Sequence, residues 1–233
     1  MERRSFLGAC AASCAAAAFG PASAGELKPR RYDRALLVDA SGAPLRASAL
    51  VPHRNYVFHY PYAATPCFLI DLGQAAGPAP KLKTAGADDY AWPGGVGPGR
   101  SIVAYSAICA HKLTYPTRDI SFISYREQAT PHSSLARVIH CCSEHSQYDP
   151  AQGARVLAGP ATQPLAAILL EYEPGRDALA AVGTLGGEMF DEFFAKFGFR
   201  LAMEHGSKGG RQKVGERSAV AELADFCRQQ VRC

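Results

Sequence analysis

The stretch HCCSEHSQYDP, from His140 to Pro150, holds a dense group of side chains that can bind metals. Within it, two residues separate Cys142 from His145, and Ser-x-Tyr-Asp follows directly. Thiolate sulfurs and imidazole nitrogens are ligands that zinc and iron–sulfur clusters take from proteins. The run ARVIHC, residues 136–141, has the pattern of a strand and leads into the stretch. The sequence therefore predicts a metal-binding loop at the end of a strand.

A second pair of the same kind, Cys109-x-His111, follows the buried strand pattern SIVAYSAI at residues 101–108. If the two loops converge, two thiolates and two imidazoles meet. Such a set suits tetrahedral zinc or a [2Fe-2S] cluster in which histidines replace cysteines on one iron. Six cysteines outside the N-terminal segment also allow three disulfides in an oxidising compartment. The mixed spacing, Cys-x-His and Cys-x-x-His, favours the cluster.

The composition favours a β-rich chain. Of 233 residues, 48% are hydrophobic, and 22 glycines and 16 prolines favour short strands and many turns. Strand patterns occupy residues 35–45, 55–60, 67–73, 101–108, 119–127, 136–141, 165–173 and 178–185. Residues 74–100 are predicted to be an irregular insertion. The net charge of +4 is mild and no basic stripe is interleaved with aromatics, so nucleic acid is not expected as a partner.

The C-terminal part, residues 186–233, is predicted to be helical. Phe190, Phe193, Phe194 and Phe197 recur at helical spacing, which indicates a helix packed on the sheet or, alternatively, a face for a partner. A second helix is expected over 218–233, with Ser218 as its N-cap.

Residues 1–24 have the features of an export signal. Arg3 and Arg4 precede Phe6-Leu7, an alanine-rich run follows, and Ala22-Ser23-Ala24 forms an A-x-A cleavage site. The paired arginines resemble the signal of the twin-arginine translocase. The apolar run is shorter than the roughly 20 residues of a membrane span. We expect a periplasmic protein, and an uncleaved signal would anchor it to the inner membrane.

Three loops together resemble the Rieske iron–sulfur proteins. Their boxes are C-x-H-x-G-C and C-x-C-H-G-S-x-Y-D, followed by a G-P-A-x-x-P-L loop that covers the cluster. The counterparts here are CAHKLT (109–114), CSEHSQYD (142–149) and GPATQPL (159–165), and the resemblance covers residues 101–183. It implies a mainly β fold over residues 25–185: a Rieske-type antiparallel β-sandwich with a cluster-binding subdomain. The helical extension would follow.

The resemblance assigns roles to individual residues and implies one Rieske-type [2Fe-2S] cluster per chain. Cys109 and Cys142 would hold the buried iron, and His111 and His145 the outer iron. A further set contributes around the cluster: the hydroxyls of Ser146 and Tyr148, which would donate hydrogen bonds to its sulfurs, and Pro160 in the covering loop. Such hydrogen bonds raise the reduction potential.

The second box departs from the family pattern. In the respiratory members a disulfide ties the two cluster loops together, and its positions correspond here to Thr114 and Glu144. The second box also lacks the glycine after its histidine, which puts the Ser146 hydrogen bond in doubt.

The remaining cysteines and histidines are not expected to bind the cluster. Because neighbours in an extended segment point to opposite faces, Cys141 is expected to face away from the cluster, either as a buried apolar residue or in a disulfide with Cys67. Cys227 and Cys233 are candidates for a bridge. Four histidines do not have the spacing of ligands: His53, His59, His132 and His205. His140 flanks the site, and the sequence assigns it no role.

The function expected is electron transfer, as a subunit of an oxidoreductase rather than a stand-alone enzyme. The donor would be quinol or a membrane or periplasmic oxidoreductase, and the acceptor a c-type cytochrome. One alternative is the small Rieske subunit of a molybdenum oxidase of the arsenite oxidase kind. A ring-hydroxylating oxygenase component would need a further iron site and a longer chain, or would be a cytosolic ferredoxin. A zinc-stabilised binding domain is the non-redox alternative.

Overall fold

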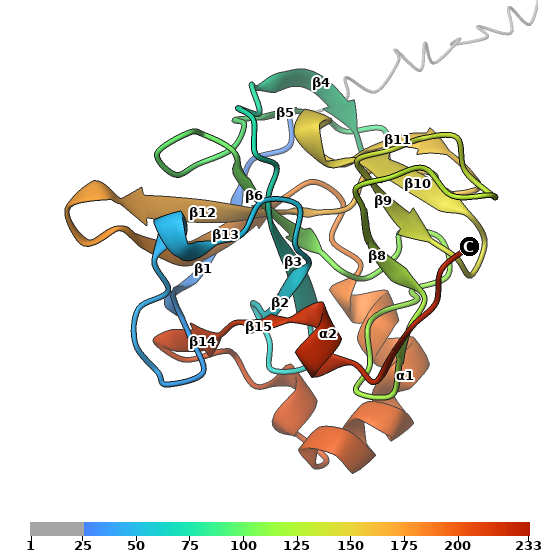
Figure 1. The fold of residues 1–233 in the computed structure, drawn as a ribbon. Helices are drawn as coiled ribbons and strands as arrows, with labels where there is room; N and C mark the ends of the chain where they lie inside the picture. The colour runs from blue at the N-terminus through green and yellow to red at the C-terminus, as the bar shows by residue number, and fades with distance from the viewer. Residues whose placement is uncertain (1–25) are drawn as a thin grey trace, which may run out of the picture.

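The computed structural model describes residues 26–233, so the expected export signal lies outside the described residues (Figure 1). The fold is mainly β, as predicted. The strands are β1 (Arg30–Val38), β2 (Tyr56–His59), β3 (Pro66–Asp71), β4 (Ala79–Lys83), β5 (Asp89–Trp92), β6 (Ile102–Ser106), β7 (Ile120–Ser121), β8 (Ile123–Arg126), β9 (Val138–Cys141), β10 (Ser146–Asp149), β11 (Arg155–Ala158), β12 (Ala167–Glu173), β13 (Ala178–Leu185), β14 (Arg217–Ala219), β15 (Ala221–Glu222) and β16 (Gln229–Gln230). The helices are α1 (Phe190–His205) and the single turn α2 (Leu223–Phe226).

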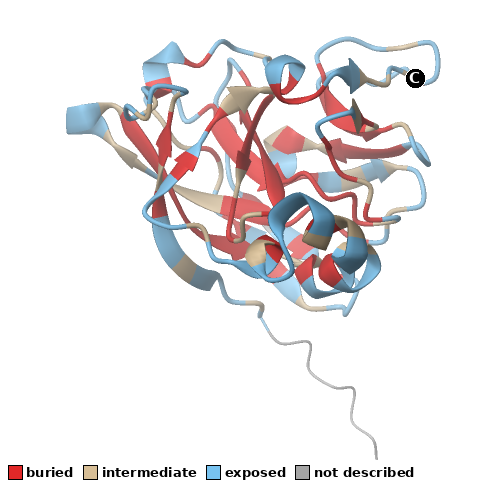
Figure 2. Cartoon of the chain, turned by 90° about the horizontal axis from the view of Figure 1, so that it is seen from below, coloured by how far each residue is buried: buried red, intermediate tan, exposed pale blue. Residues whose placement is uncertain are grey.

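The largest element is an eight-stranded sheet in the order β14-β1-β13-β12-β6-β3-β2-β15. Apolar side chains cover both of its faces, because strands such as β13 are buried along their whole length. Figure 2 shows this buried interior between exposed loops. The strand patterns at 165–173 and 178–185 form β12 and β13, which pair as a hairpin with its turn at Pro174–Arg176. The insertion expected to be irregular contains the β4–β5 hairpin.

The two edges of this sheet meet one segment of the chain. β14 pairs in parallel with β1, and β15, which follows directly, pairs with β2 at the opposite edge. The expected helix over 218–233 is therefore wrong, since only Leu223–Phe226 makes a helical turn. Ser218 does not cap a helix: its hydroxyl donates to the carbonyl of His59 at 2.8 Å. The alternation of buried and exposed residues from 217 to 220 fits a strand instead.

A smaller sheet, β11-β10-β9-β8, carries the second candidate loop between β9 and β10. Ile123, Ile139 and Tyr148 of this sheet belong to the same apolar cluster as Phe68 of the large sheet. The Tyr105 hydroxyl of β6 also donates to the carbonyl of Pro150 at 2.7 Å. Because β6 leads into the first loop, these contacts fix the two loops relative to each other.

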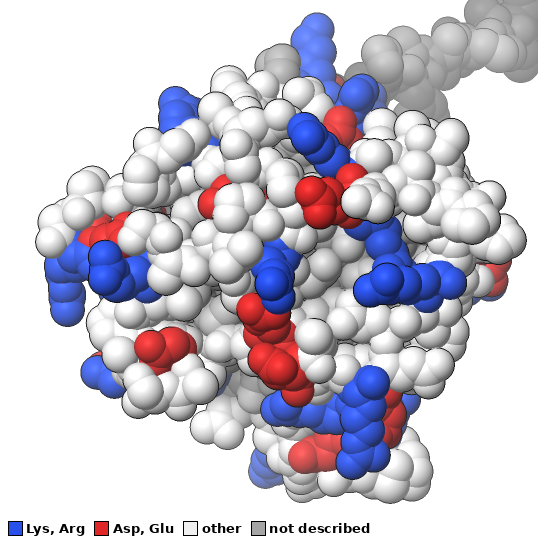
Figure 3. Space-filling view, viewed as in Figure 1, with Lys and Arg blue, Asp and Glu red and all other residues white. Residues whose placement is uncertain are grey.

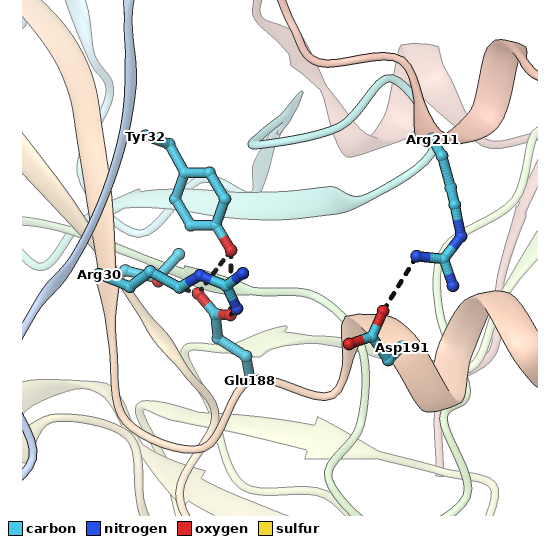
Figure 4. A network of polar contacts seen from close by, with 6 residues as sticks. Arg30, Tyr32, Glu188, Asp191 and Arg211 are labelled. Atoms are coloured by element: carbon cyan, nitrogen blue, oxygen red, sulfur yellow. Dashed lines mark hydrogen bonds and ion pairs between the residues drawn. The ribbon is translucent and has the colours of Figure 1, made fainter.

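Helix α1 is confirmed and packs through its aromatic stripe. Phe190, Phe193 and Phe194 are buried, and the Phe193 ring meets Tyr115 edge-on at 4.8 Å between centroids. Just before the helix, Glu188 accepts hydrogen bonds from Arg30 and Tyr32 (Figure 4). In the first turn of the helix, Asp191 pairs with Arg211.

The described surface carries both signs of charge. Lysine and arginine are interspersed with aspartate and glutamate on the face seen in Figure 3, without a broad stripe of either sign there. Among residues 26–233, no helix has the length and apolar character needed to cross a membrane.

Candidate metal centre

The first loop is closed tightly after β6. The amide of Leu113 donates to the carbonyl of Cys109 at 3.0 Å, and the amide of Cys109 donates to the carbonyl of Thr114 at 2.8 Å. Leu113 takes a left-handed conformation, with φ 61°, which lets the chain reverse within this short segment. Cys109 is thereby held inside the protein and His111 near its surface.

The second loop is the turn of the β9–β10 hairpin. Cys141 pairs with Ser146 in the ladder, so residues 142–145 form the turn, and His145 adopts a left-handed φ of 58°. In this register Cys141 and Tyr148 face the interior, where both are fully buried. The turn itself projects outward.

A pair of buried thiols joins the two loops. Cys109 and Cys141 are 0% exposed, and both are free thiols. The contact with the Cys141 thiol lowers the pKa of Cys109 and raises the pKa of Cys141, because one sulfur of the pair is the better acceptor and the other keeps its proton. The Tyr148 hydroxyl lies 3.3 Å from the Cys109 sulfur and accepts from the amide of Ala110 at 3.2 Å.

The structure does not bring Cys142 to Cys109. Its sulfur forms a disulfide with Cys233, and a disulfide sulfur has no thiolate to offer a metal. Cys141 was expected to face away from the cluster, but it faces the interior. The register of the β9–β10 hairpin puts its side chain on the same face as Tyr148, whatever its spacing to His145. The sequence carried this signal: the Rieske box separates its first cysteine from the tyrosine by seven positions, as Cys141 is from Tyr148.

The other proposed bridges are also wrong. Cys67 and Cys227 are free, buried thiols, so neither the Cys67–Cys141 nor the Cys227–Cys233 pairing occurs. The Cys142–Cys233 disulfide ties the second loop to the C-terminal segment. This segment lies beside β7, because its strand β16 pairs with β7. Between the two loops themselves, Lys112 and Glu144 approach to 3.9 Å, an exposed ion pair that stabilises little.

The ring of His145 lies next to the ring of His140. Their ring centroids are 5.6 Å apart, and His132 lies 6.2 Å from His145. The ligand atoms of His140, His145 and Cys233 all lie within 4.8 Å of one another. His140, which had no assigned role, is fully buried beside the second loop. The four ligands predicted from sequence are thus not gathered at one point, although the two loops that carry them are adjacent.

Two of the buried polar atoms that lack a hydrogen-bond partner among the described residues belong to these two loops. They are Nδ1 of His111, in the first loop, and Oγ of Ser146, at the end of the second. An unpaired buried polar group is costly, so such atoms indicate a missing partner. Sulfide ions accept hydrogen bonds from hydroxyls, and iron takes imidazole nitrogen and thiolate sulfur. The donor set of Cys109, Cys141, His111 and Ser146 therefore fits an iron–sulfur cluster.

The segment 159–165 covers the second loop. Gly159 has a φ of 86°, and a Cβ there would lie 2.5 Å from the carbonyl oxygen of His145, so only glycine allows this approach. Pro160 is exposed beside it. At the other end, Gln163 is buried, accepts from the amide of Ala85 at 2.9 Å and donates to the carbonyl of Gly187 at 3.3 Å. The segment is thus fixed at both ends.

Chains of known structure are similar to this protein. No family model matches the chain. The soluble domain of the Rieske protein II (soxF) from Sulfolobus acidocaldarius is 26% identical, over 67% of this chain and 82% of that chain, with a TM-score of 0.47.

Proposed function

We propose that this chain is a Rieske-type electron-transfer protein that holds one [2Fe-2S] cluster. Cys109 and Cys141 would bind the inner iron, and His111 and His145 the outer iron. The observation that carries the proposal is the buried Cys109–Cys141 thiol pair, with the Tyr148 hydroxyl 3.3 Å from one sulfur. Cys141 replaces Cys142 as a ligand in this proposal.

When bound, the cluster supplies one-electron transfer in the broad Rieske range of about −150 to +300 mV. The chain's own residues set the potential within that range. Tyr148 would donate to the Cys109 thiolate and Ser146 to a sulfide, and both hydrogen bonds stabilise the more negative reduced state. Gly159 to Gln163 would keep water from the second loop.

We further propose a periplasmic location and two classes of redox partner. Quinol or a membrane or periplasmic oxidoreductase would deliver electrons, and a c-type cytochrome would accept them. The signal-like residues 1–24 support export, and the position of His145 in an exposed turn supports electron exchange through the outer iron.

The test is the metal content and spectrum of the protein produced in a host that assembles iron–sulfur clusters. We expect equal amounts of iron and acid-labile sulfide, two of each per chain, and a rhombic EPR signal in the reduced state. Cys109→Ser should lose both, whereas Cys67→Ser, at a buried thiol remote from the pair in the sequence, should keep them. Zinc at one per chain without sulfide would refute the proposal.

A further inference from the structure

A cavity of about 400 Å³ lies between α1, α2 and the segment that follows the first loop. Its wall includes His59, Tyr115, Arg118, Arg200 and Phe226. In Figure 1 the two helices that border it stand at the lower end of the molecule. A volume of this order suits a small organic molecule.

Among the polar groups of the wall without a polar partner in the described residues are His59, Arg118 and the hydroxyl of Tyr115. The side chain of His59 makes no hydrogen bond, and its ring lies 5.7 Å from that of Phe226. Burial lowers the pKa of His59 to about 4, with further lowering by His205 and Arg118, so the ring is neutral near pH 7. Arg118 stacks on Phe226, with its guanidinium carbon 4.4 Å from the ring centroid, and makes no ion pair.

The acidic residues of the wall are already engaged. Glu204 pairs with Arg200 at 2.8 Å, and Asp119 pairs with Arg228 at 3.3 Å. The cavity combines an apolar, aromatic side with the unpaired guanidinium of Arg118, the unpaired ring of His59 and the unpaired hydroxyl of Tyr115.

We propose that this cavity binds a small carboxylate with a flat apolar body. The carboxylate would accept hydrogen bonds from Arg118 and His59, and the body would lie against Phe226 and Tyr115. A guanidinium binds a carboxylate through two parallel hydrogen bonds, which makes Arg118 the main source of charge recognition. Such a site is independent of the cluster and goes beyond the proposed function.

The site also adjoins the metal-binding region. Tyr115 and Arg118 belong to the segment that leaves the first loop, and the Arg118 carbonyl accepts from the amide of Arg228 in the C-terminal segment at 2.9 Å. A bound carboxylate would therefore link α1, the first loop and the C-terminal segment.

Benzoate serves as the probe and benzamide, of the same shape without the charge, as its control. In calorimetric titration of the full chain, benzoate should bind and benzamide should bind at least about tenfold more weakly, because a charge-assisted hydrogen bond is lost. Arg118→Gln should weaken benzoate binding by a similar factor. Arg176→Gln, which removes an exposed arginine outside the cavity wall, should leave it unchanged.

A second measurement avoids dependence on folded variants. Benzoate should shift the ¹⁵N resonances of the His59 ring in the unmodified chain, whereas benzamide at equal concentration should not. Equal binding of the two compounds, no benzoate binding at millimolar concentration, or unchanged affinity in a folded Arg118→Gln variant would overturn the proposal.

Discussion

Replacing the two adjacent cysteines separately distinguishes their roles. In Cys141→Ser the thiol that faces Cys109 is removed, so we expect iron and sulfide to fall to background. In the double variant Cys142→Ser/Cys233→Ser the thiol pair remains intact, so the cluster should be retained. Both cysteines of the bridge are changed together, because a single replacement would leave a free thiol beside His140.

The double variant should instead be less stable. The bridge joins residues 91 apart in the sequence. Closing a loop of that length in the unfolded chain corresponds to about 4.6 kcal/mol at 25 °C, and removal of native disulfides typically costs about 2–5 kcal/mol. We therefore expect a loss of about 2–5 kcal/mol in the free energy of unfolding, with little change at the Cys109–Cys141 pair.

The assay combines iron and sulfide analysis with guanidinium unfolding under non-reducing conditions. Dithiothreitol-treated wild-type protein is the matched control, because it loses the bridge without a substitution. The reasoning is refuted if Cys142→Ser/Cys233→Ser loses the cluster while Cys141→Ser keeps it. It is also refuted if the double variant unfolds at the same guanidinium concentration as the oxidised wild type.

Further predictions concern single side chains. Tyr148→Phe removes the hydroxyl 3.3 Å from the Cys109 sulfur, so the midpoint potential should fall by some tens of millivolts in voltammetry, with iron content unchanged; an unaltered midpoint would contradict the hydrogen bond. Burial lowers the pKa of His59 and of His140 to about 4, and the unfolded chain takes up these protons near pH 6.5. The stability that these histidines contribute above about pH 6.5 should therefore be lost as pH falls towards 4. In His59→Gln the urea midpoint should differ less between pH 7 and pH 5 than in the wild type. A difference as large as that of the wild type would contradict this role of His59. Gln163→Leu removes both hydrogen bonds that hold residues 159–165, so amide exchange of this segment and cluster loss to a chelator should both speed up, whereas Gln74→Leu at an exposed position should change neither.

The strand framework could be predicted from sequence because apolar and β-branched runs are separated by glycine and proline. The three loops could be recognised because their order and internal spacing resemble a family pattern. Spacing to His145 predicts Cys142 as the ligand, and this prediction is wrong. The hairpin register, with Cys141 opposite Ser146, decides which cysteine faces inward. One residue of shift reverses the direction of every side chain in a strand.

The C-terminal segment was predicted least well. Residues 218–226 contain alanine, leucine and glutamate, which favour a helix locally. The open edges of the large sheet override this preference, because pairing with β1 and β2 satisfies backbone groups that would otherwise be exposed. The Cys142–Cys233 bridge was missed for a related reason, since it depends on where β16 directs the chain.

The attachment of Arg217–Glu222 to both edges of the large sheet has a consequence for solubility. An unpaired edge strand offers a row of amides and carbonyls to another chain and is a site of aggregation. Here one short segment shields both edges, and it follows the other strands of that sheet in the sequence. The sheet remains open to intermolecular pairing until this segment has been added, so folding intermediates that lack it are the species most exposed to self-association. Substitution of Ser218 or Val220 by proline would leave a sheet edge open to intermolecular pairing in the folded protein as well.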